Sequence, residues 1–241
     1  MEHLRGAKHL VGMRDKRGLT LTAALTSSFL IGLACSGSPV SPSTTVVATK
    51  PPVMGDYPLA PGTYRVSSME PLSVSFTVGD GWHGQDWFLF NENRQTHLGF
   101  TRVVNLFADS CHWKDNATEP PIGPTVDDLI AAISSHSERT PTAPEQVNVG
   151  GRAGKAIEWS VPADVDFAKC DDGIYASWTM STWRGDVLGV RSDWARSQVD
   201  RIYALDVGGT RLVMEENWIP GTTDAERAAM HAIVESLTIS D

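Results

Sequence analysis

Tryptophan is the residue type whose placement in this sequence most favours ligand binding. Trp82 and Trp87 bracket a turn that is rich in glycine, and Trp113 directly follows a cysteine. An indole ring has an apolar body and one N–H donor, so rings held at loop edges could line a concave ligand site. We therefore take Trp82, Trp87 and Trp113 as candidate ligand-binding residues. The alternative is that they pack in the core, as tryptophans inside predicted strands do.

Catalytic motifs with a recognised spacing are not evident. The sequence contains no GxSxG nucleophile elbow, no HExxH zinc motif and no P-loop. An acid–base pair assembled from distant positions stays open, for instance His112 or His83 with Asp86 or Asp109. Such a pair would make the protein an envelope hydrolase. No catalytic residue and no cofactor is predicted.

Metal binding is not indicated either. The histidines of the predicted mature chain fall at no known ligand spacing. Four aspartates cluster around Cys170 but lack the oxygen-ligand spacing and mid-loop glycine of an EF-hand: Asp164, Asp166, Asp171 and Asp172. We expect a solvated acidic loop and no metal site.

The N-terminal segment has the pattern of an export signal. Basic residues up to Arg17 precede the apolar stretch 18–34, which is shorter and richer in Thr and Ser than the roughly 20 apolar residues of a membrane-spanning helix. The stretch ends in Ile-Gly-Leu-Ala-Cys35, which resembles the lipobox of bacterial lipoproteins. That resemblance implies that the thiol of Cys35 carries diacylglycerol. The usual Leu three residues before the cysteine is replaced by Gly32, and ordinary secretion with an unmodified Cys35 is the alternative.

Composition divides the chain into three parts. Residues 1–34 are the predicted signal peptide, 35–60 a lipidated cysteine with a Ser/Thr/Pro-rich tether, and 61–241 a single domain. The signal contains five basic and two acidic residues, so its removal changes the net charge from −9 to −12. A negative field of that size repels nucleic acid, which we exclude as a partner.

Export also determines the chemistry expected of the remaining two cysteines. Outside the cytoplasm, a cysteine pair inside a domain is more often bridged than free, which predicts a disulfide between Cys111 and Cys170. Closing a loop of about 60 residues would stabilise the fold by roughly 4 kcal/mol on the chain-entropy model. A metal site that includes His112 is the weaker alternative, because the pair has no CxxC spacing.

The elements that must position these residues are mostly strands. The segments 201–207 and 211–215 flank Gly208-Gly209, which is a strong hairpin signal. Alternating apolar residues and turn signals predict further strands at 72–78, 87–91, 98–107, 147–149, 156–161 and 174–183.

Two amphipathic helices are predicted between and after the strands. Thr125 caps a helix over 126–135, with Asp128 three residues further on, and Thr223 with Glu226 caps a helix that continues to the C-terminus. Antiparallel strands with two separated helices predict an α+β fold, in which an antiparallel sheet has both helices packed on one face.

Turn, cap and core motifs spread over nearly all of the domain carry a family resemblance. They resemble a group of uncharacterised actinobacterial lipoproteins at residues 59–64, 78–82, 111–113, 123–129, 154–155, 161–162 and 205–212. This resemblance implies an architecture and an extracytoplasmic location but no activity. A looser likeness, which rests on element order alone, is to the PsbP/Mog1-type fold of some mycobacterial lipoproteins.

Together these observations predict a lipoprotein on the extracytoplasmic face of the cell membrane, held there by the lipid at Cys35. We expect a non-catalytic binding or accessory module. Its partner could be a small molecule, an envelope component or another protein, and the sequence does not choose among them. The envelope hydrolase stays the alternative from another functional class.

Overall fold

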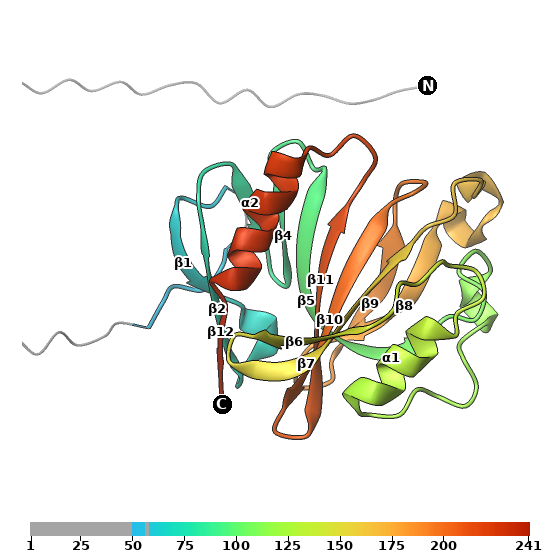
Figure 1. Ribbon diagram of the computed structural model, residues 1–241, viewed down its shortest axis with the longest axis horizontal. Helices are drawn as coiled ribbons and strands as arrows, with labels where there is room; N and C mark the ends of the chain where they lie inside the picture. The colour runs from blue at the N-terminus through green and yellow to red at the C-terminus, as the bar shows by residue number, and fades with distance from the viewer. Residues whose placement is uncertain (1–49, 56–57) are drawn as a thin grey trace, which may run out of the picture. The chain divides into compact units, whose positions relative to one another are not determined.

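The computed structural model describes residues 50–55 and 58–241. A nine-stranded antiparallel sheet lies at the centre of this part of the chain (Figure 1). Seven strands follow the order β3-β4-β5-β11-β10-β7-β6, and β8 pairs with β5 and with β9. The strands are β3 (Trp82–Gln85), β4 (Phe88–Asn91), β5 (Thr96–Leu106), β6 (Glu145–Val149), β7 (Arg152–Ser160), β8 (Tyr175–Ser181), β9 (Val187–Asp193), β10 (Val199–Val207) and β11 (Thr210–Trp218).

A smaller sheet and several helices complete the described residues. The three-stranded sheet has the order β1-β2-β12 and is also antiparallel. Its strands are β1 (Gly62–Arg65), β2 (Ser73–Val78) and β12 (Thr238–Ser240); the α-helices are α1 (Val126–Ser134) and α2 (Asp224–Glu235); the 3-10 helices are η1 (Ser67–Met69), η2 (Trp113–Asp115), η3 (Phe167–Lys169) and η4 (Asp171–Gly173). The predicted α+β fold, an antiparallel sheet with two packed helices, is confirmed.

Both α-helices begin where the capping residues predict. The hydroxyl of Thr125 accepts the N–H of Asp128, and the Asp128 carboxylate accepts the N–H of Thr125. Thr223 and Glu226 form the same reciprocal pair at α2. Each capping box satisfies two backbone donors that a helix start otherwise leaves without partners.

The two helices cover opposite faces of the larger sheet. In β10, Ile202 packs in the cluster that contains Leu129 of α1, whereas Tyr203 packs in the cluster that contains Met230 of α2. Adjacent side chains of a strand point to opposite faces, so each helix covers a different face. Figure 1 shows α2 beside β5 and α1 beside β7. The prediction that both helices cover one face is therefore wrong, because the central strands are apolar on both sides.

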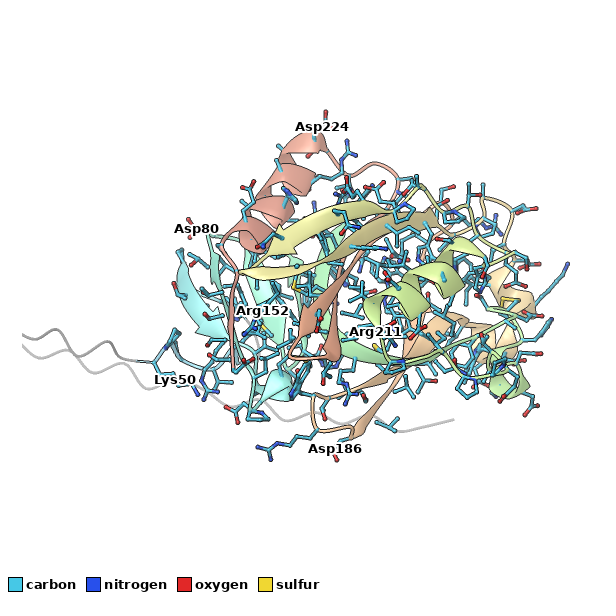
Figure 2. All side chains as sticks on the ribbon, turned by 60° about the horizontal axis from the view of Figure 1, so that its bottom comes forward. Lys50, Asp80, Arg152, Asp186, Arg211 and Asp224 are labelled. Atoms are coloured by element: carbon cyan, nitrogen blue, oxygen red, sulfur yellow. A yellow bond between two sulfur atoms is a disulfide. The ribbon has the colours of Figure 1, made fainter. Side chains whose placement is uncertain are left out.

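The hairpin of β10 and β11 turns at Gly208-Gly209, as predicted. Both glycines have positive φ, 59° and 81°, which a two-residue hairpin turn of this hand requires. Next to the turn, the Arg211 side chain, labelled in Figure 2, donates to the carbonyl oxygens of Gly123 and Thr125, both at 2.8 Å. These bonds fix the start of α1 against the hairpin.

The two ends of the described chain differ from the sequence-based expectation. The C-terminal helix ends at Glu235, and the last residues form β12, whose Ile239 is buried. At the other end, Met54 and Leu59 are buried in the core, although we expected residues up to 60 to be tether. Residues 1–34, Cys35 and most of the predicted tether lie outside the described residues. None of the described helices combines the length and apolarity needed to cross a membrane.

Candidate functional site

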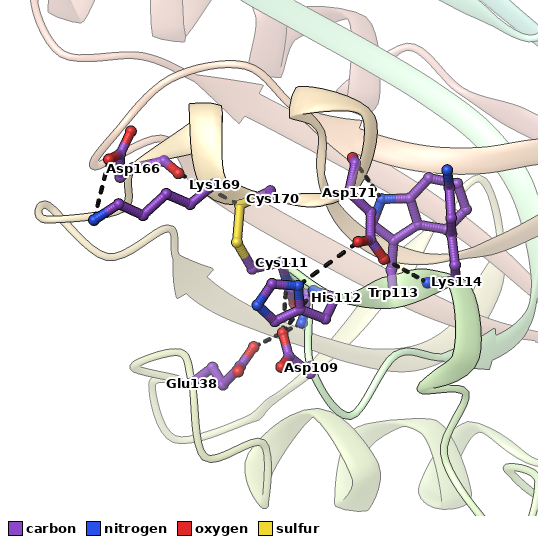
Figure 3. Close-up of a disulfide and its surroundings, with 11 residues drawn as sticks. Asp109, Cys111, His112, Trp113, Lys114, Glu138, Asp166, Lys169, Cys170 and Asp171 are labelled. Carbon is purple, nitrogen blue, oxygen red and sulfur yellow. Dashed lines mark hydrogen bonds and ion pairs between the residues drawn. A yellow bond between two sulfur atoms is a disulfide. The ribbon is translucent and has the colours of Figure 1, made fainter.

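A disulfide joins Cys111, in the loop after β5, to Cys170, just before η4 (Figure 3). This confirms the predicted bridge. Trp113 lies beside it, where its indole N–H donates to the carbonyl oxygen of Asp171 at 3.3 Å and its ring contacts Phe107. Trp113 is therefore held by the disulfide loop.

Two of the four acidic residues around this disulfide pair with lysine side chains. The carboxylate of Asp172 accepts the Lys114 ammonium at 2.6 Å, and Asp166 lies 3.5 Å from the ammonium of Lys169. The predicted acidic loop thus contains surface ion pairs. Within residues 50–55 and 58–241, no group of three or more His, Cys, Asp or Glu side chains is arranged to hold a metal ion.

The candidate tryptophans do not share one site. Trp82 is only 5% exposed and belongs to the core beneath β2, so it is a packing residue. Trp113 lies at the disulfide loop, and Trp87, directly before β4, lines a cavity at another place in the fold. The expectation that these tryptophans line a common concave ligand site is therefore not met.

The cavity at Trp87 has a volume of about 250 Å³ and opens between β4, β5, β9 and β11. Its walls are aromatic: the rings of Trp87 and Phe88 lie 4.7 Å apart between centroids, and those of His97 and Trp194 lie 4.2 Å apart. Trp194 follows β9 and is 41% exposed, so it forms part of the rim. Polar residues, a glycine and a valine complete the lining: Arg94, Gly99, Val190, Arg191, Ser192, Glu215 and Asn217.

Strand register explains why polar groups meet at this cavity. Glu215 and Asn217 alternate on one face of β11, and they lie opposite Gly99 and His97 of β5. A Cβ atom at Gly99 would lie 3.2 Å from both Cγ and Oε1 of Glu215. The missing side chain of Gly99 therefore makes room for the Glu215 carboxylate.

A buried ionic network adjoins the cavity and shares Arg191 and Glu215 with its lining. Arg191 donates to Glu215 at 2.5 Å, to Asp193 at 2.9 Å and to Asp200 at 2.9 Å, and Arg139 donates to the other oxygen of Asp193 at 2.5 Å. These five side chains are at most 5% exposed. Buried charges of this kind need every partner, because one left alone in a low-dielectric interior is strongly destabilising.

The carboxylates in the network differ in their proton affinity. Burial, together with the neighbouring Asp193, raises the pKa of Asp200 to about 7. Burial also acts to raise the pKa of Asp193, but Arg139 and Arg191 outweigh it and lower the pKa. For Glu215, burial outweighs the attraction of Arg191, and the pKa is raised. The three acids thus share two guanidinium groups unequally.

His97 is held neutral in the cavity wall. Burial, followed by the charges of Arg191 and Arg94, lowers the pKa of His97 to about 3. The ring also forms a hydrogen bond with the backbone of Arg94, which opposes this shift but is smaller. At neutral pH the imidazole therefore carries no charge and is a very weak base.

Three polar atoms of the cavity residues are buried without a hydrogen-bond partner among the described residues. They are Nε2 of His97, Oε2 of Glu215 and Oδ1 of Asn217. Buried polar atoms are nearly always paired, so a group of unpaired ones calls for a physical explanation. Here all three belong to residues that line one cavity, where a small molecule or solvent could supply the partners.

The acid–base pair suggested for His112 and Asp109 is not formed as expected, because each group has another partner. The imidazole of His112 lies 3.6 Å from the carboxylate of Asp171, while Asp109 accepts the backbone N–H groups of Cys111 and His112. His83 stacks on Phe90 with ring centroids 5.4 Å apart. A general base works best with a pKa near the working pH, so His97, with its pKa of about 3, is poorly suited to that role.

Sequence reasoning did not single out the residues that line this cavity with Trp87. The signal available was the presence of polar residues at alternate positions in strands that are otherwise apolar: Arg191 with Asp193, and Glu215 with Asn217. That pattern indicates a polar patch inside a buried sheet.

Comparisons with known proteins give a likeness among solved structures but no family. No family model matches the chain, and no curated protein matches it. Among solved structures, the solution structure of cyanobacterial PsbP (CyanoP) from Synechocystis sp. PCC 6803 matches with 13% sequence identity and a TM-score of 0.36. The match covers 77% of this chain and 96% of that chain. No residue role is transferred at this level of similarity, and the resemblance to actinobacterial lipoproteins stays a prediction.

Proposed function

We propose that this protein is a lipid-anchored, extracytoplasmic binding module that holds a small molecule in the cavity of Trp87, His97 and Trp194. The observation that carries the proposal is the group of three unpaired polar atoms at this aromatic-walled cavity. Ligand sites combine mostly aromatic walls with a few polar groups that fix orientation, which is the composition found here.

The size of the cavity limits the ligand. Pockets for drug-sized ligands have volumes of roughly 300–1,000 Å³. With about 250 Å³, this cavity suits a single ring or the terminal group of a larger molecule. Because Trp194 is partly exposed at the rim, a longer molecule could extend from the cavity into solvent.

A non-catalytic role is favoured over hydrolysis by the state of the polar groups. The imidazole of His97 is uncharged at neutral pH, and Glu215 is engaged by Arg191. With so low a proton affinity, His97 is poorly suited to take a proton from a substrate. The lipid anchor rests on the sequence around Cys35, which lies outside the described residues.

Ligand-observed NMR of the full-length chain with a small-molecule extract of the cell envelope tests this function. We expect saturation transfer from the protein to at least one compound. Trp194→Ala should abolish the transfer, whereas Trp113→Ala, which removes an indole at the disulfide loop, should leave it intact. The proposal fails if no compound receives saturation from the wild-type protein, or if Trp194→Ala has no effect.

A further inference from the structure

The buried polar atoms without a partner at the cavity include two acceptor oxygens. Oε2 of Glu215 belongs to a carboxylate whose other oxygen already accepts from Arg191, and Oδ1 of Asn217 is an amide oxygen. His97 is neutral and uses one ring nitrogen toward the backbone of Arg94. If that nitrogen carries the single proton of the ring, Nε2 is also an acceptor. A complementary ligand must therefore present several O–H or N–H donors.

The walls favour a ligand that also has an apolar face. Trp87 and Phe88 form one aromatic pair, and Trp194 with His97 forms another. The flat face of an indole packs against C–H groups or against a cation. Sugar rings and organic ammonium ions both combine donors on the edge with C–H groups on the face.

The charges around the cavity distinguish these two. Arg191 and Arg94 both line the cavity, and both disfavour a positive charge on the imidazole of His97. An ammonium ion would meet the same two guanidinium groups. An anion would face the Glu215 carboxylate and the other acceptors instead. A neutral ligand avoids both penalties.

We propose that the cavity takes the neutral, hydroxyl-bearing ring of a sugar, either as a free pyranose or as the terminal residue of a glycan. This inference rests on the small-molecule role proposed above and names the class of ligand. The hydroxyl groups donate to Glu215, Asn217 and His97, and the C–H face of the ring packs on Trp194. Hydroxyl groups also replace water at such acceptors without loss of hydrogen bonds.

Tryptophan fluorescence of the full-length chain tests the ligand class with defined probes. The probes are methyl α-D-glucopyranoside, methyl α-D-galactopyranoside and methyl α-D-mannopyranoside, trisaccharides that end in the same residues, choline as a cation and uracil as a neutral planar ring. We expect a saturable change with at least one pyranoside or trisaccharide at concentrations up to about 10 mM. Equal affinity for a methyl pyranoside and for the trisaccharide that ends in the same residue indicates a free sugar. Tighter binding of the trisaccharide indicates the end of a glycan.

Two variants tie the signal to the cavity. Asn217→Leu removes one acceptor with little change of size and should weaken sugar binding about tenfold. Trp194→Ala changes a rim residue, so folding is retained, and it should weaken binding at least about tenfold. Trp113→Phe is the matched control and should bind as the wild type does.

Three outcomes would overturn the sugar inference. Saturable binding of choline or uracil without binding of any sugar would exclude the sugar ring but leave the small-molecule function intact. Sugar binding that Trp194→Ala does not weaken would place the sugar elsewhere. Absence of binding by all probes, together with an empty result in the envelope-extract experiment, would remove both proposals.

Discussion

Replacing Arg191 by Met should destabilise the fold strongly, because it removes the cation that three buried carboxylates share. Arg191 bonds to Asp193, Asp200 and Glu215, and only Arg139 would remain to balance them. Met fills most of the space of the arginine stem, so the main cost is electrostatic. Breaking a buried ion pair by removing one partner costs about 3–5 kcal/mol.

Urea unfolding at pH 7, followed by tryptophan fluorescence, measures this loss against a matched control. Arg201→Met also breaks two ion pairs, with Glu158 and Glu145, but the Arg201 side chain is 26% exposed and its partners are 30% and 53% exposed. Exposed pairs contribute about 0–1 kcal/mol, so the control should lose no more than that.

Lowering the pH from 7 to 5 should reduce the loss of unfolding free energy caused by Arg191→Met. Burial and Asp193 raise the pKa of Asp200 to about 7, so at pH 5 this group is neutral in the folded protein and needs no cation. The difference in unfolding free energy between wild type and variant should therefore be smaller at pH 5 than at pH 7. A loss below about 1 kcal/mol at pH 7, equal to that of Arg201→Met, would refute the electrostatic account.

The remaining predictions concern the anchor, the disulfide and the cavity histidine. Cys35→Ser should abolish the diacylglycerol adduct and release the protein from the membrane fraction; mass spectrometry that finds an unmodified Cys35 in the wild type would contradict the anchor. Replacing Cys111 and Cys170 together by Ser should lower the unfolding free energy in urea by roughly 2–5 kcal/mol, and reduced wild type should behave alike. Because burial and Arg191 lower the pKa of His97 from 6.5 to about 3, the unfolded chain binds a proton there that the folded chain does not. The unfolding free energy should fall as pH decreases from 6.5 toward 3, and His97→Phe should reduce that slope; an unchanged slope would contradict the shift.

Local signals in the sequence were sufficient for most elements. Thr125 and Thr223 mark both helix starts through side chains only three residues away, and Gly208-Gly209 marks the hairpin. Signals of this kind depend on neighbouring residues and therefore survive folding. The face that each helix covers depends on contacts between distant segments, and β10, buried on both sides, has no pattern that reveals it.

The candidate site was predicted only in part for the same reason. Trp87, a candidate residue from the sequence, lines a cavity, whereas its neighbours His97, Trp194 and Glu215 reach it through pairing of β4, β5 and β11 and through packing of β9. Trp82 resembles Trp87 in its sequence context, yet it points into the core. The alternation of buried and more exposed residues along β3 turns Trp82 inward. The strand is only four residues long and lies beside glycines, so the sequence does not reveal this alternation.

The central claim, that a small molecule occupies the cavity of Trp87, His97 and Trp194, is tested most directly by two-dimensional NMR of the indole N–H groups during titration with the envelope extract. We predict that the resonances of Trp87 and Trp194 shift together and saturate, while the resonance of Trp113 stays in place. Unmoved resonances of Trp87 and Trp194, or shifts confined to Trp113, would contradict the claim.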